Sequence, residues 1–324
     1  MLLEVKGLMT SFQTREGLAK AVDGVSLYVD KKEMVALVGE SGCGKSVTAL
    51  SIMQLVQSPP GKIVAGEVIW KGQDLLKLDA DAVRQLRGSR LAMVFQEPMT
   101  SLNPVLTVGR QIVEVLQLHR RLDLPNARLE CARVMTNVGM ADAERVMKRY
   151  PHECSGGMRQ RIMIAMALCC HPDLLIADEP TTAIDVTIQA QILELINRLA
   201  SETQMAVLLI THNLGIVARY SQRIYVMYAG RVIEQGTAED IYTAPAHPYT
   251  IGLLRCVPRL DQACGEQLAT IDGEPPDLLR LPGGCAFRPR CVYLGDECHP
   301  EAPHLRRVKD NHWVACWRQL PTEE

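Results

Sequence analysis

Eight consecutive residues of this 324-residue chain, Gly39-Glu-Ser-Gly-Cys-Gly-Lys45-Ser46, have the spacing G-x-x-x-x-G-K-[ST]. Glycines at these positions let successive backbone N–H groups curve around phosphate oxygens, and a helix that begins there adds positive potential. The Lys45 ammonium can then reach the β- and γ-phosphates, and the Ser46 hydroxyl can hold Mg²⁺. The segment therefore predicts a binding site for a nucleoside triphosphate.

A second chemical feature is the pair of acids that ends an apolar run, Leu174-Leu-Ile-Ala-Asp178-Glu179. A buried strand of a parallel sheet delivers such carboxylates to its carboxyl edge, where ligands of open α/β sheets bind. We expect Asp178 to bind Mg²⁺ through water, and Glu179 to polarise the attacking water or accept its proton. An isolated Asp-Glu at a strand end is common, so the pair indicates a catalytic site only in combination with the phosphate loop.

A third segment, Ser155-Gly156-Gly157, narrows the kind of nucleotide hydrolase. It precedes Asp178 and begins a predicted helix, so it forms another cradle for an anion. One bound nucleotide needs only one such cradle, and a local helix cap without a ligand is the plainer interpretation. A second cradle is useful if it faces the γ-phosphate held by another subunit, so the segment predicts ATP clamped between two chains.

A parallel sheet would position these residues. Continuous apolar runs at 34–38, 174–177 and 207–210 are typical of strands buried on both faces, and helical stretches separate them. Shorter strands are predicted at 68–70 and 91–95, with an antiparallel ribbon in the first 30 residues. The alternation predicts an α/β fold with a parallel-sheet core, an antiparallel β subdomain and a helical subdomain that begins near Thr107.

The organisation of the chain changes after about Gly236, where prolines are frequent and periodicity is weak. We expect a nucleotide-binding domain over residues 1–240, with its helical subdomain at about 105–165. A small, loop-rich extension is expected over residues 241–324.

Composition limits the classes of function. Apolar residues make up 47% of the chain, enough for a sizeable core, whereas aromatic residues make up only 4%. The net charge of −2 gives no general attraction to nucleic acid, so we expect no nucleic-acid partner. No apolar run approaches the ~20 residues of a membrane helix, and the first residues lack a secretory pattern, so a cytosolic chain is expected.

Together, the phosphate loop, Gln96, Ser155-Gly156-Gly157, the acidic pair and His212 resemble the nucleotide-binding domain of ABC ATPases over about residues 1–240. The resemblance implies ATP hydrolysis, with ATP and Mg²⁺ as cofactors. Gln96 resembles the loop glutamine that touches Mg²⁺ and the attacking water. His212 resembles the switch histidine that contacts the γ-phosphate.

Two further roles are implied by the same resemblance. Phe12 is placed like the aromatic residue that stacks on adenine, with a buried strand residue as the plainer alternative. Asp185 resembles the loop residue that contacts the opposite subunit. The family usually has leucine where Cys154 stands, and often aspartate where Asn213 stands. We expect Cys154 to serve packing, and Asn213 to alter how the histidine loop is held.

The expected site has three groups of residues. The catalytic residues are Glu179, His212 and Gln96. The residues expected to bind ATP within this chain are Phe12, Gly39, Glu40, Ser41, Gly42, Cys43, Gly44, Lys45, Ser46, Val47, Gln96 and Asp178. The residues expected to contact ATP held by the other subunit are Ser155, Gly156, Gly157, Met158 and Gln160. Mg²⁺ is expected at Ser46, Gln96 and Asp178.

More particular segments resemble the oligopeptide/dipeptide importer branch of this family, which also includes nickel importers. They are the stretch after Gln96, residues 155–161 and His247-Pro-Tyr-Thr250. The resemblance implies import of di- or oligopeptides by an assembly with two transmembrane permease subunits, an extracytoplasmic solute-binding protein and a second, related ATPase subunit. The chain would then lie peripherally on the cytoplasmic face of the bacterial inner membrane.

The chain has eleven cysteines, and four of the six in the proline-rich extension lie within 32 residues, at Cys285, Cys291, Cys298 and Cys316. Four thiols on loops suit a tetrahedral metal or cluster site. Their arrangement resembles the extension of peptide-importer ATPases and thereby implies a [4Fe–4S] cluster, with zinc, free thiols or disulfides as alternatives. A cluster would stabilise a segment that lacks a core of its own.

Other functions fit parts of this sequence. The same ATPase can serve nickel or another small solute, because the cargo is selected by other subunits. A soluble ABC ATPase that acts on DNA or ribosomes usually carries two cassettes or a long coiled coil, and this chain has one cassette and no heptad run. A phosphate-loop kinase or metabolic transferase would not need Ser155-Gly156-Gly157.

Overall fold

The computed structural model describes residues 1–97, 101–181, 185–257 and 270–318, without the side chains of residues 186 and 187. Contacts divide the chain into two compact units. The first comprises Met1–Val29, Met34–Leu76 and Ile210–Glu324, and the second comprises Asp30–Glu33 and Lys77–Leu209. The boundary between them falls inside strand β8 (Ala206–Thr211).

The first unit begins with an antiparallel sheet in the strand order β2-β1-β4-β5. Its strands are β1 (Leu3–Gln13), β2 (Leu18–Val29), β4 (Gly61–Trp70) and β5 (Gln73–Asp74). β1 pairs with both β2 and β4. Leu3 and Leu8 of β1 and Val25 of β2 are fully buried. This is the antiparallel ribbon that the first 30 residues predict.

The same unit contains five strands of a larger sheet, in the order β11-β12-β10-β9-β3. They are β3 (Met34–Val38), β9 (Arg223–Tyr228), β10 (Arg231–Thr237), β11 (Arg306–Lys309) and β12 (His312–Val314). β3 and β9 are parallel, and every residue of β3 is buried, as its apolar run predicts. β12 is antiparallel to both β10 and β11, so part of the extension completes this sheet.

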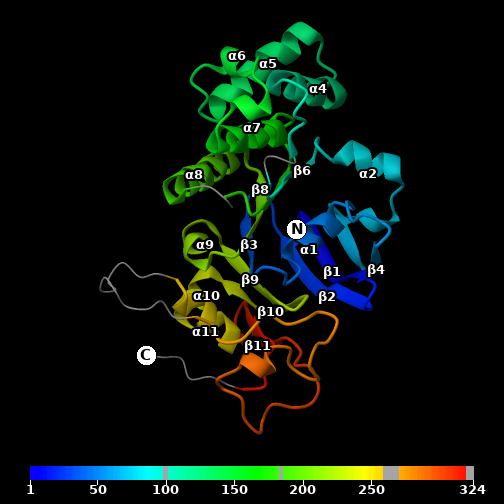
Figure 1. The fold of residues 1–324 in the computed structure, drawn as a ribbon, viewed down its shortest axis with the longest axis vertical. Coiled ribbons are helices and arrows are strands. Elements are labelled where there is room, and N and C mark those ends of the chain that lie inside the picture. The colour runs from blue at the N-terminus through cyan, green and yellow to red at the C-terminus, as the bar shows by residue number, and fades with distance from the viewer. Residues whose placement is uncertain (98–100, 182–184, 258–269, 319–324) are drawn as a thin grey trace. The chain divides into compact units, whose positions relative to one another are not determined.

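Short helices complete the first unit: α1 (Lys45–Ile52), η1 (Leu75–Lys77) at its boundary, α9 (Leu214–Tyr220), α10 (Ala238–Thr243), α11 (Pro248–Arg255) and η3 (Arg288–Arg290). α11 begins at His247, whose Nδ1 accepts a hydrogen bond from the N–H of Tyr249 at 3.0 Å. Figure 1 shows residues 270–318 of the extension, in orange and red, beside α11 and β10.

The second unit contains β6 (Leu91–Val94), β7 (Leu174–Asp178) and most of β8, in the order β8-β7-β6. β6 and β7 are parallel, with Val94 opposite Ala177. This pairing brings the residues that follow the two strands to the same edge of the sheet. The edge therefore receives both Gln96 and the acidic pair of Asp178 and Glu179.

Helices make up most of the second unit. They are α2 (Ala80–Leu86), α4 (Val108–Arg120), α5 (Leu124–Asn137), α6 (Ala143–Val146), η2 (Pro151–Glu153), α7 (Gly156–Leu168) and α8 (Val186–Thr203). Figure 1 shows α4, α5, α6 and α7 grouped together. Val108, Ile112 and Leu116 are fully buried on one face of α4, as their helical spacing predicts. Among the described residues, none of the helices has the length and apolar character needed to cross a bilayer.

Candidate nucleotide site

The phosphate loop connects β3 to α1 in the first unit, and two of its glycines are required by close backbone contacts. Gly39 has φ of 155°, and a Cβ there would lie 2.2 Å from the carbonyl oxygen of Met227. Gly44 has φ of 104°, and a Cβ there would lie 2.1 Å from the carbonyl oxygen of Ala21. Any side chain at either position would push the loop out of place, so these glycines fix where the loop lies.

Lys45 and Ser46 lie at the start of α1, where its N-terminal N–H groups favour a phosphate. The Lys45 side chain is buried, and its Nζ donates hydrogen bonds to the carbonyl oxygens of Gly39 and Glu40, both at 2.8 Å. Ser46 is half-buried, and Gly42 has φ of 80° with open space beside it. The loop therefore has the cationic side chain, the hydroxyl and the glycine-rich backbone that ATP with Mg²⁺ requires.

Phe12 and His212 also belong to the first unit. Phe12 is half-buried in β1, and its ring packs so closely on Gly61 that a Cβ there would lie 2.7 Å from it. His212 directly follows β8 and is exposed. The next residue, Asn213, precedes α9 as its N-cap, and its side chain makes no cap hydrogen bond. The N–H of Asn213 donates a hydrogen bond to the Thr211 hydroxyl at 3.1 Å.

The structure brings Gln96 and Glu179 together in the second unit. Nε2 of Gln96 donates a hydrogen bond to Oε2 of Glu179 at 3.0 Å. Asp178 and Glu179 are both buried at the end of β7. Glu179 has φ of 44°, a left-handed conformation that costs an ordinary residue roughly 1–3 kcal/mol. The strand register thus places an amide and a carboxylate where they can orient the same water molecule.

The Ser-Gly-Gly segment begins α7, as the sequence predicts. The Ser155 hydroxyl accepts a hydrogen bond from the N–H of Met158 at 3.3 Å, and Gly156 has open space where a Cβ would be. Gln160 is buried, and its Nε2 has no hydrogen-bond partner among the described residues. Cys154 is buried and its thiol lies near the Tyr150 carbonyl, which agrees with the expected packing role.

Asp185 is exposed at the start of α8 and does not cap that helix with its side chain. Glu97 is described, but residues 98–100 and 182–184 beside these segments lie outside the described residues. The candidate residues are divided between the units: the phosphate loop, Phe12 and His212 lie in the first. Gln96, the Ser-Gly-Gly segment, Asp178, Glu179 and Asp185 lie in the second.

The four cysteines of the extension do not form the predicted metal site. Cys285, Cys291, Cys298 and Cys316 line one cavity of about 20 Å³ as free thiols, together with the side chains of Phe287 and Trp317. Within the described parts of the chain, no three Cys, His, Asp or Glu side chains are arranged to hold a metal ion. The prediction of a [4Fe–4S] cluster or other bound metal here is therefore wrong.

The physical reason is the small space that the thiols surround: a cavity of about 20 Å³ holds roughly one water molecule and is too small for a four-iron cluster. Burial raises the pKa of Cys285 and Cys291, and it raises the pKa of Cys316 to about 11. Burial thus keeps these cysteines as neutral thiols. The alternative of free thiols agrees with the structure.

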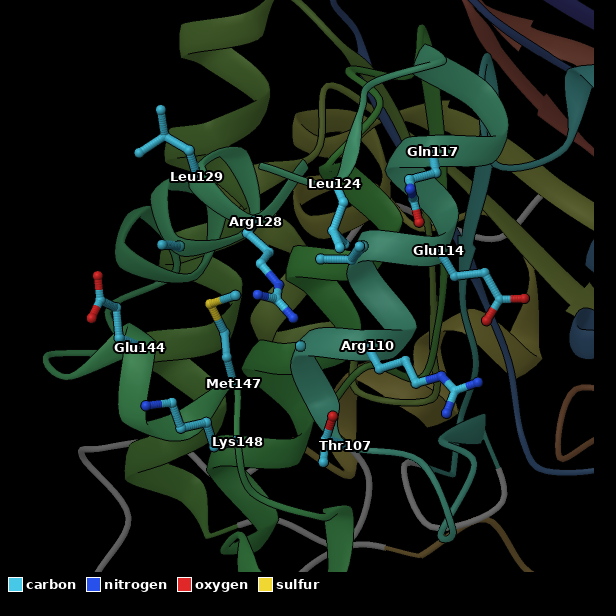
Figure 2. A pocket seen from close by; sticks show the side chains of 13 residues that line it. Thr107, Arg110, Glu114, Gln117, Leu124, Arg128, Leu129, Glu144, Met147 and Lys148 are labelled. Atoms are coloured by element: carbon cyan, nitrogen blue, oxygen red, sulfur yellow. The ribbon is translucent and has the colours of Figure 1, made fainter. Parts of the chain in front are cut away.

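The second unit contains a larger, open cavity of about 970 Å³, lined by residues of α4, α5 and α6 and by the residues after α6. Figure 2 shows Arg128 and Met147 reaching into it, with Leu124 between them and α4. Arg110, Glu114, Glu144 and Lys148 place charges of both signs around this space. We call this cavity the helical-subdomain groove.

Comparisons with known proteins identify the family of this chain. A family model described as "ABC transporter" matches residues 22–182, and one described as "Oligopeptide/dipeptide transporter, C-terminal region" matches residues 233–298. The dipeptide transport ATP-binding protein DppD of Bacillus subtilis is 50% identical, over 98% of this chain and 95% of its own length. This chain belongs to the peptide-import branch of the ABC transporter ATP-binding proteins.

Other members of the branch and a solved structure support this membership. The oligopeptide transport ATP-binding protein OppD of Bacillus subtilis is 47% identical, over 99% of this chain and 89% of its own length. A dimeric structure of the ATP-binding cassette MJ0796, bound to ADP and Pi, is similar with a TM-score of 0.66. It is 26% identical and covers 73% of this chain and 99% of its own.

The comparisons confirm the predicted ABC ATPase fold, the ATPase activity and the peptide-importer branch of this ABC ATPase. They also agree with ATP and Mg²⁺ as its cofactors. The domain boundary at residue 240 and the roles of the individual site residues stay predictions.

Two residues beside the phosphate loop were not predicted from the sequence. Tyr249 and Arg290 both contact Glu40, and Arg290 is 250 positions away from it in the chain. No periodicity or spacing links residues so far apart. The nearest sequence signals are that Tyr249 lies within the segment His247-Pro-Tyr-Thr250 and that Arg290 lies between two cysteines.

Proposed function

We propose that this ABC ATPase hydrolyses ATP to power the import of di- or oligopeptides across the cytoplasmic membrane. The observation that carries the catalytic part is the hydrogen bond between Gln96 and Glu179. A carboxylate can accept a proton from water, and an amide beside it can hold that water in position. The buried, strained position of Glu179 supports the assignment, because such strain is concentrated at functional sites.

Each remaining residue has a proposed role toward the nucleotide. Backbone N–H groups of residues 39–46 bind the phosphates, Lys45 neutralises their charge and the Ser46 hydroxyl holds Mg²⁺. Asp178 binds the same ion through water, and His212 contacts the γ-phosphate. Phe12 stacks on the adenine ring. When bound, Mg²⁺ supplies positive charge that offsets the charge developing on the phosphates.

The working unit is proposed to be a pair of ATPase subunits. Ser155, Gly156 and Gly157 would bind the γ-phosphate held by the second subunit, and the open space beside Gly156 supports this. Nε2 of Gln160, which has no hydrogen-bond partner in the described parts of the chain, is a further donor near the start of α7. Asp185 would contact the opposite subunit. The second subunit is proposed to be a related ATPase.

The complete importer is proposed to include two transmembrane permease subunits and an extracytoplasmic solute-binding protein. We place this chain peripherally, on the cytoplasmic face of the inner membrane. The helical-subdomain groove is the proposed docking site for a cytoplasmic loop of a permease, because it combines apolar walls with charges of both signs. Closure of the ATPase pair would then move the permeases through this contact.

Peptide cargo is proposed because the named relatives DppD and OppD are dipeptide and oligopeptide transport proteins. The experiment is uptake of a labelled dipeptide by cells that lack this gene and carry it on a plasmid. Restored dipeptide uptake is expected. Restored uptake of labelled nickel in the same cells, without dipeptide uptake, would favour the nickel-import alternative.

The catalytic assignment predicts the behaviour of Glu179→Gln in the assembled transporter. Loss of the carboxylate removes the proton acceptor, so steady-state ATP hydrolysis should fall by roughly 100-fold or more. ATP should still bind, because Lys45 and the loop backbone are unchanged. Phosphate release and retention of labelled ATP measure the two effects.

Glu202→Gln is the matched control, because Glu202 is exposed near the end of α8 and carries no proposed role. This variant should hydrolyse ATP as the wild-type protein does. Hydrolysis at the wild-type rate in Glu179→Gln would contradict the assignment of the general base.

A further inference from the structure

Glu40 is the second residue of the phosphate loop, and three of its polar groups bind other residues. Its N–H donates a hydrogen bond to the Tyr249 hydroxyl at 2.7 Å, and its carbonyl oxygen accepts one from Lys45 Nζ at 2.8 Å. Its carboxylate binds the Arg290 guanidinium. Two of these three partners, Tyr249 and Arg290, come from the part of the chain that follows residue 240.

The contact between Arg290 and Glu40 is bidentate. Nη1 of Arg290 donates to Oε2 of Glu40 at 2.7 Å, and Nη2 donates to Oε1 at 2.9 Å. The Arg290 side chain is 5% exposed and that of Glu40 is 25% exposed. Charge-assisted, bidentate pairs in such surroundings are strong and directional. Loss of one partner leaves the other charge poorly solvated, which is unfavourable.

The guanidinium has three further acceptors, two in the extension and one in β9. Its Nε donates to the Asp272 carbonyl oxygen at 2.9 Å, its Nη2 to the Ile271 carbonyl oxygen at 3.2 Å and its Nη1 to the Tyr228 hydroxyl at 3.5 Å. An arginine side chain has five N–H groups, and with the two bonds to Glu40 every one has an acceptor. The side chain therefore cannot turn away from Glu40 without breaking other bonds.

Apolar contacts reinforce this connection. Pro275, Pro276 and Leu278 line a cavity of about 60 Å³ together with the loop residues from Glu40 to Cys43. The rings of Tyr228, Tyr249 and Phe287 pack on one another, with centroid distances of 4.6–5.5 Å. The extension thus reaches the loop through an ion pair and through the hydroxyl of Tyr249, whose ring is held between Tyr228 and Phe287.

We propose that the extension holds the phosphate loop in its ATP-binding shape, and that Arg290 is the positioning residue through which it does so. The proposal rests on the proposed function, because it concerns the affinity of that nucleotide site. A glycine-rich loop has many accessible conformations, and ordering it on binding would cost affinity. Arg290 reduces this cost by holding Glu40 before ATP arrives.

The expected effect is on affinity and not on the chemical step. Arg290 contacts Glu40 and is not a catalytic residue. The loop must hold the phosphates in the ground state and in the transition state alike. Loss of such uniform binding raises KM and leaves kcat unchanged. Arg290→Gln should therefore weaken ATP binding by roughly 10-fold, the scale of one lost charged hydrogen bond.

The test is a double-mutant cycle in the full-length chain, read by titration with a fluorescent ATP analogue and Mg²⁺. The variants are Arg290→Gln, Glu40→Gln and the two combined. The combined variant should bind no more weakly than Arg290→Gln alone, because both changes break the same pair. The matched control is Arg288→Gln, an exposed arginine on the same short helix η3, which should bind as the wild type does.

A second measurement separates loop ordering from a change of charge. Amide hydrogen exchange of residues 40–44 without nucleotide should be faster in Arg290→Gln than in Arg288→Gln. Arg290→Lys, which keeps the charge but not the bidentate geometry, should give intermediate affinity. If Arg290→Gln does not fold, Arg290→Lys and Glu40→Gln are compared with the control instead.

Several results would overturn the proposal. Wild-type affinity in Arg290→Gln, additive effects in the combined variant, or unchanged exchange at residues 40–44 would each do so. If the wild-type chain itself binds no ATP analogue, the proposed function fails. If the wild-type chain binds ATP and Arg290→Gln binds it with the same affinity, the proposed function stands and only the role of Arg290 fails.

Discussion

His247 is buried where α11 begins, and its surroundings favour the neutral ring. Nδ1 accepts the Tyr249 N–H, while Nε2 is buried with no hydrogen-bond partner among the described residues. Burial lowers the pKa of His247 to about 4, although the facing charge of Glu234 opposes this shift. The Glu234 carboxylate is already bound to the backbone of Ala246 and His247 and to the His312 ring.

The lowered pKa of His247 predicts loss of stability in acid. The unfolded chain binds a proton at this residue below about pH 6.5, whereas the folded chain binds it only below about 4. Stability should therefore be complete above this window and should fall by about 3 kcal/mol as the pH decreases through it. Urea unfolding at a series of pH values measures this loss.

His247→Asn keeps a side-chain acceptor for the Tyr249 N–H but does not titrate. This variant should be less stable at neutral pH and should lose about 3 kcal/mol less than the wild type between pH 6.5 and 4. His304→Asn, at an exposed histidine of the extension, should follow the wild-type pH dependence. Parallel pH profiles for His247→Asn and the wild type would exclude His247 as the source.

At the residue scale, the sequence predicted groups that act within one short segment. Gly39, Lys45 and Ser46 could be recognised because their spacing alone implies phosphate binding. The pairing of Arg290 with Glu40 could not, because only the folded chain brings them together. The cysteines led to a wrong prediction for a related reason: their spacing does not reveal how little space the thiols enclose in the folded chain.

Among the elements, the helical-subdomain groove is the surface that a permease would contact. Its walls come from α4, α5 and α6, and Leu129 of α5 is a lining residue that is 72% exposed. Leu118 of α4 is exposed to nearly the same extent, at 70%, but does not line the groove. The two leucines therefore form a matched pair for testing the docking site.

We predict that Leu129→Asp disrupts assembly with the permease subunits. A carboxylate buried in an apolar contact would cost roughly 2 kcal/mol, which corresponds to roughly a 30-fold loss of complex. Leu118→Asp should assemble normally, and both variants should bind ATP as the wild type does. Co-purification of the permeases with the tagged ATPase measures assembly. Equal recovery with both variants would place the docking site elsewhere.

Elements were predictable in proportion to their length and apolar content. The buried strands β3 and β7 appeared as continuous apolar runs, and α4 appeared as a helical repeat. The hairpin of β11 and β12 was missed, because strands of four and three residues are too short to show alternation. The turn of this hairpin can be recognised only in the structure, where Asn311 has φ of 61°.

For the whole molecule, ATP binding should be measurable as stability. A ligand that binds only the folded chain at 100 times its dissociation constant raises the free energy of unfolding by about 2.7 kcal/mol. Mg²⁺ and a non-hydrolysable ATP analogue should stabilise the wild-type chain by this amount. Lys45→Ala should lose the effect, because its Nζ is the proposed partner of the phosphates.

Lys62→Ala is the control for this measurement, since Lys62 is exposed on β4 and has no proposed role in the site. Thermal unfolding with and without the analogue measures each shift. An equal ligand-induced shift in Lys45→Ala and the wild type would mean that the analogue binds outside the phosphate loop.

The ion pair between Glu40 and Arg290 also sets an order of events during protein synthesis. A ribosome that adds about 5–20 residues per second needs roughly 12–50 s to reach Arg290 after Glu40. Throughout that interval the nascent phosphate loop lacks its support from the extension. A truncated chain released before residue 290 would therefore compete poorly for cellular ATP, and only finished subunits would reach full affinity.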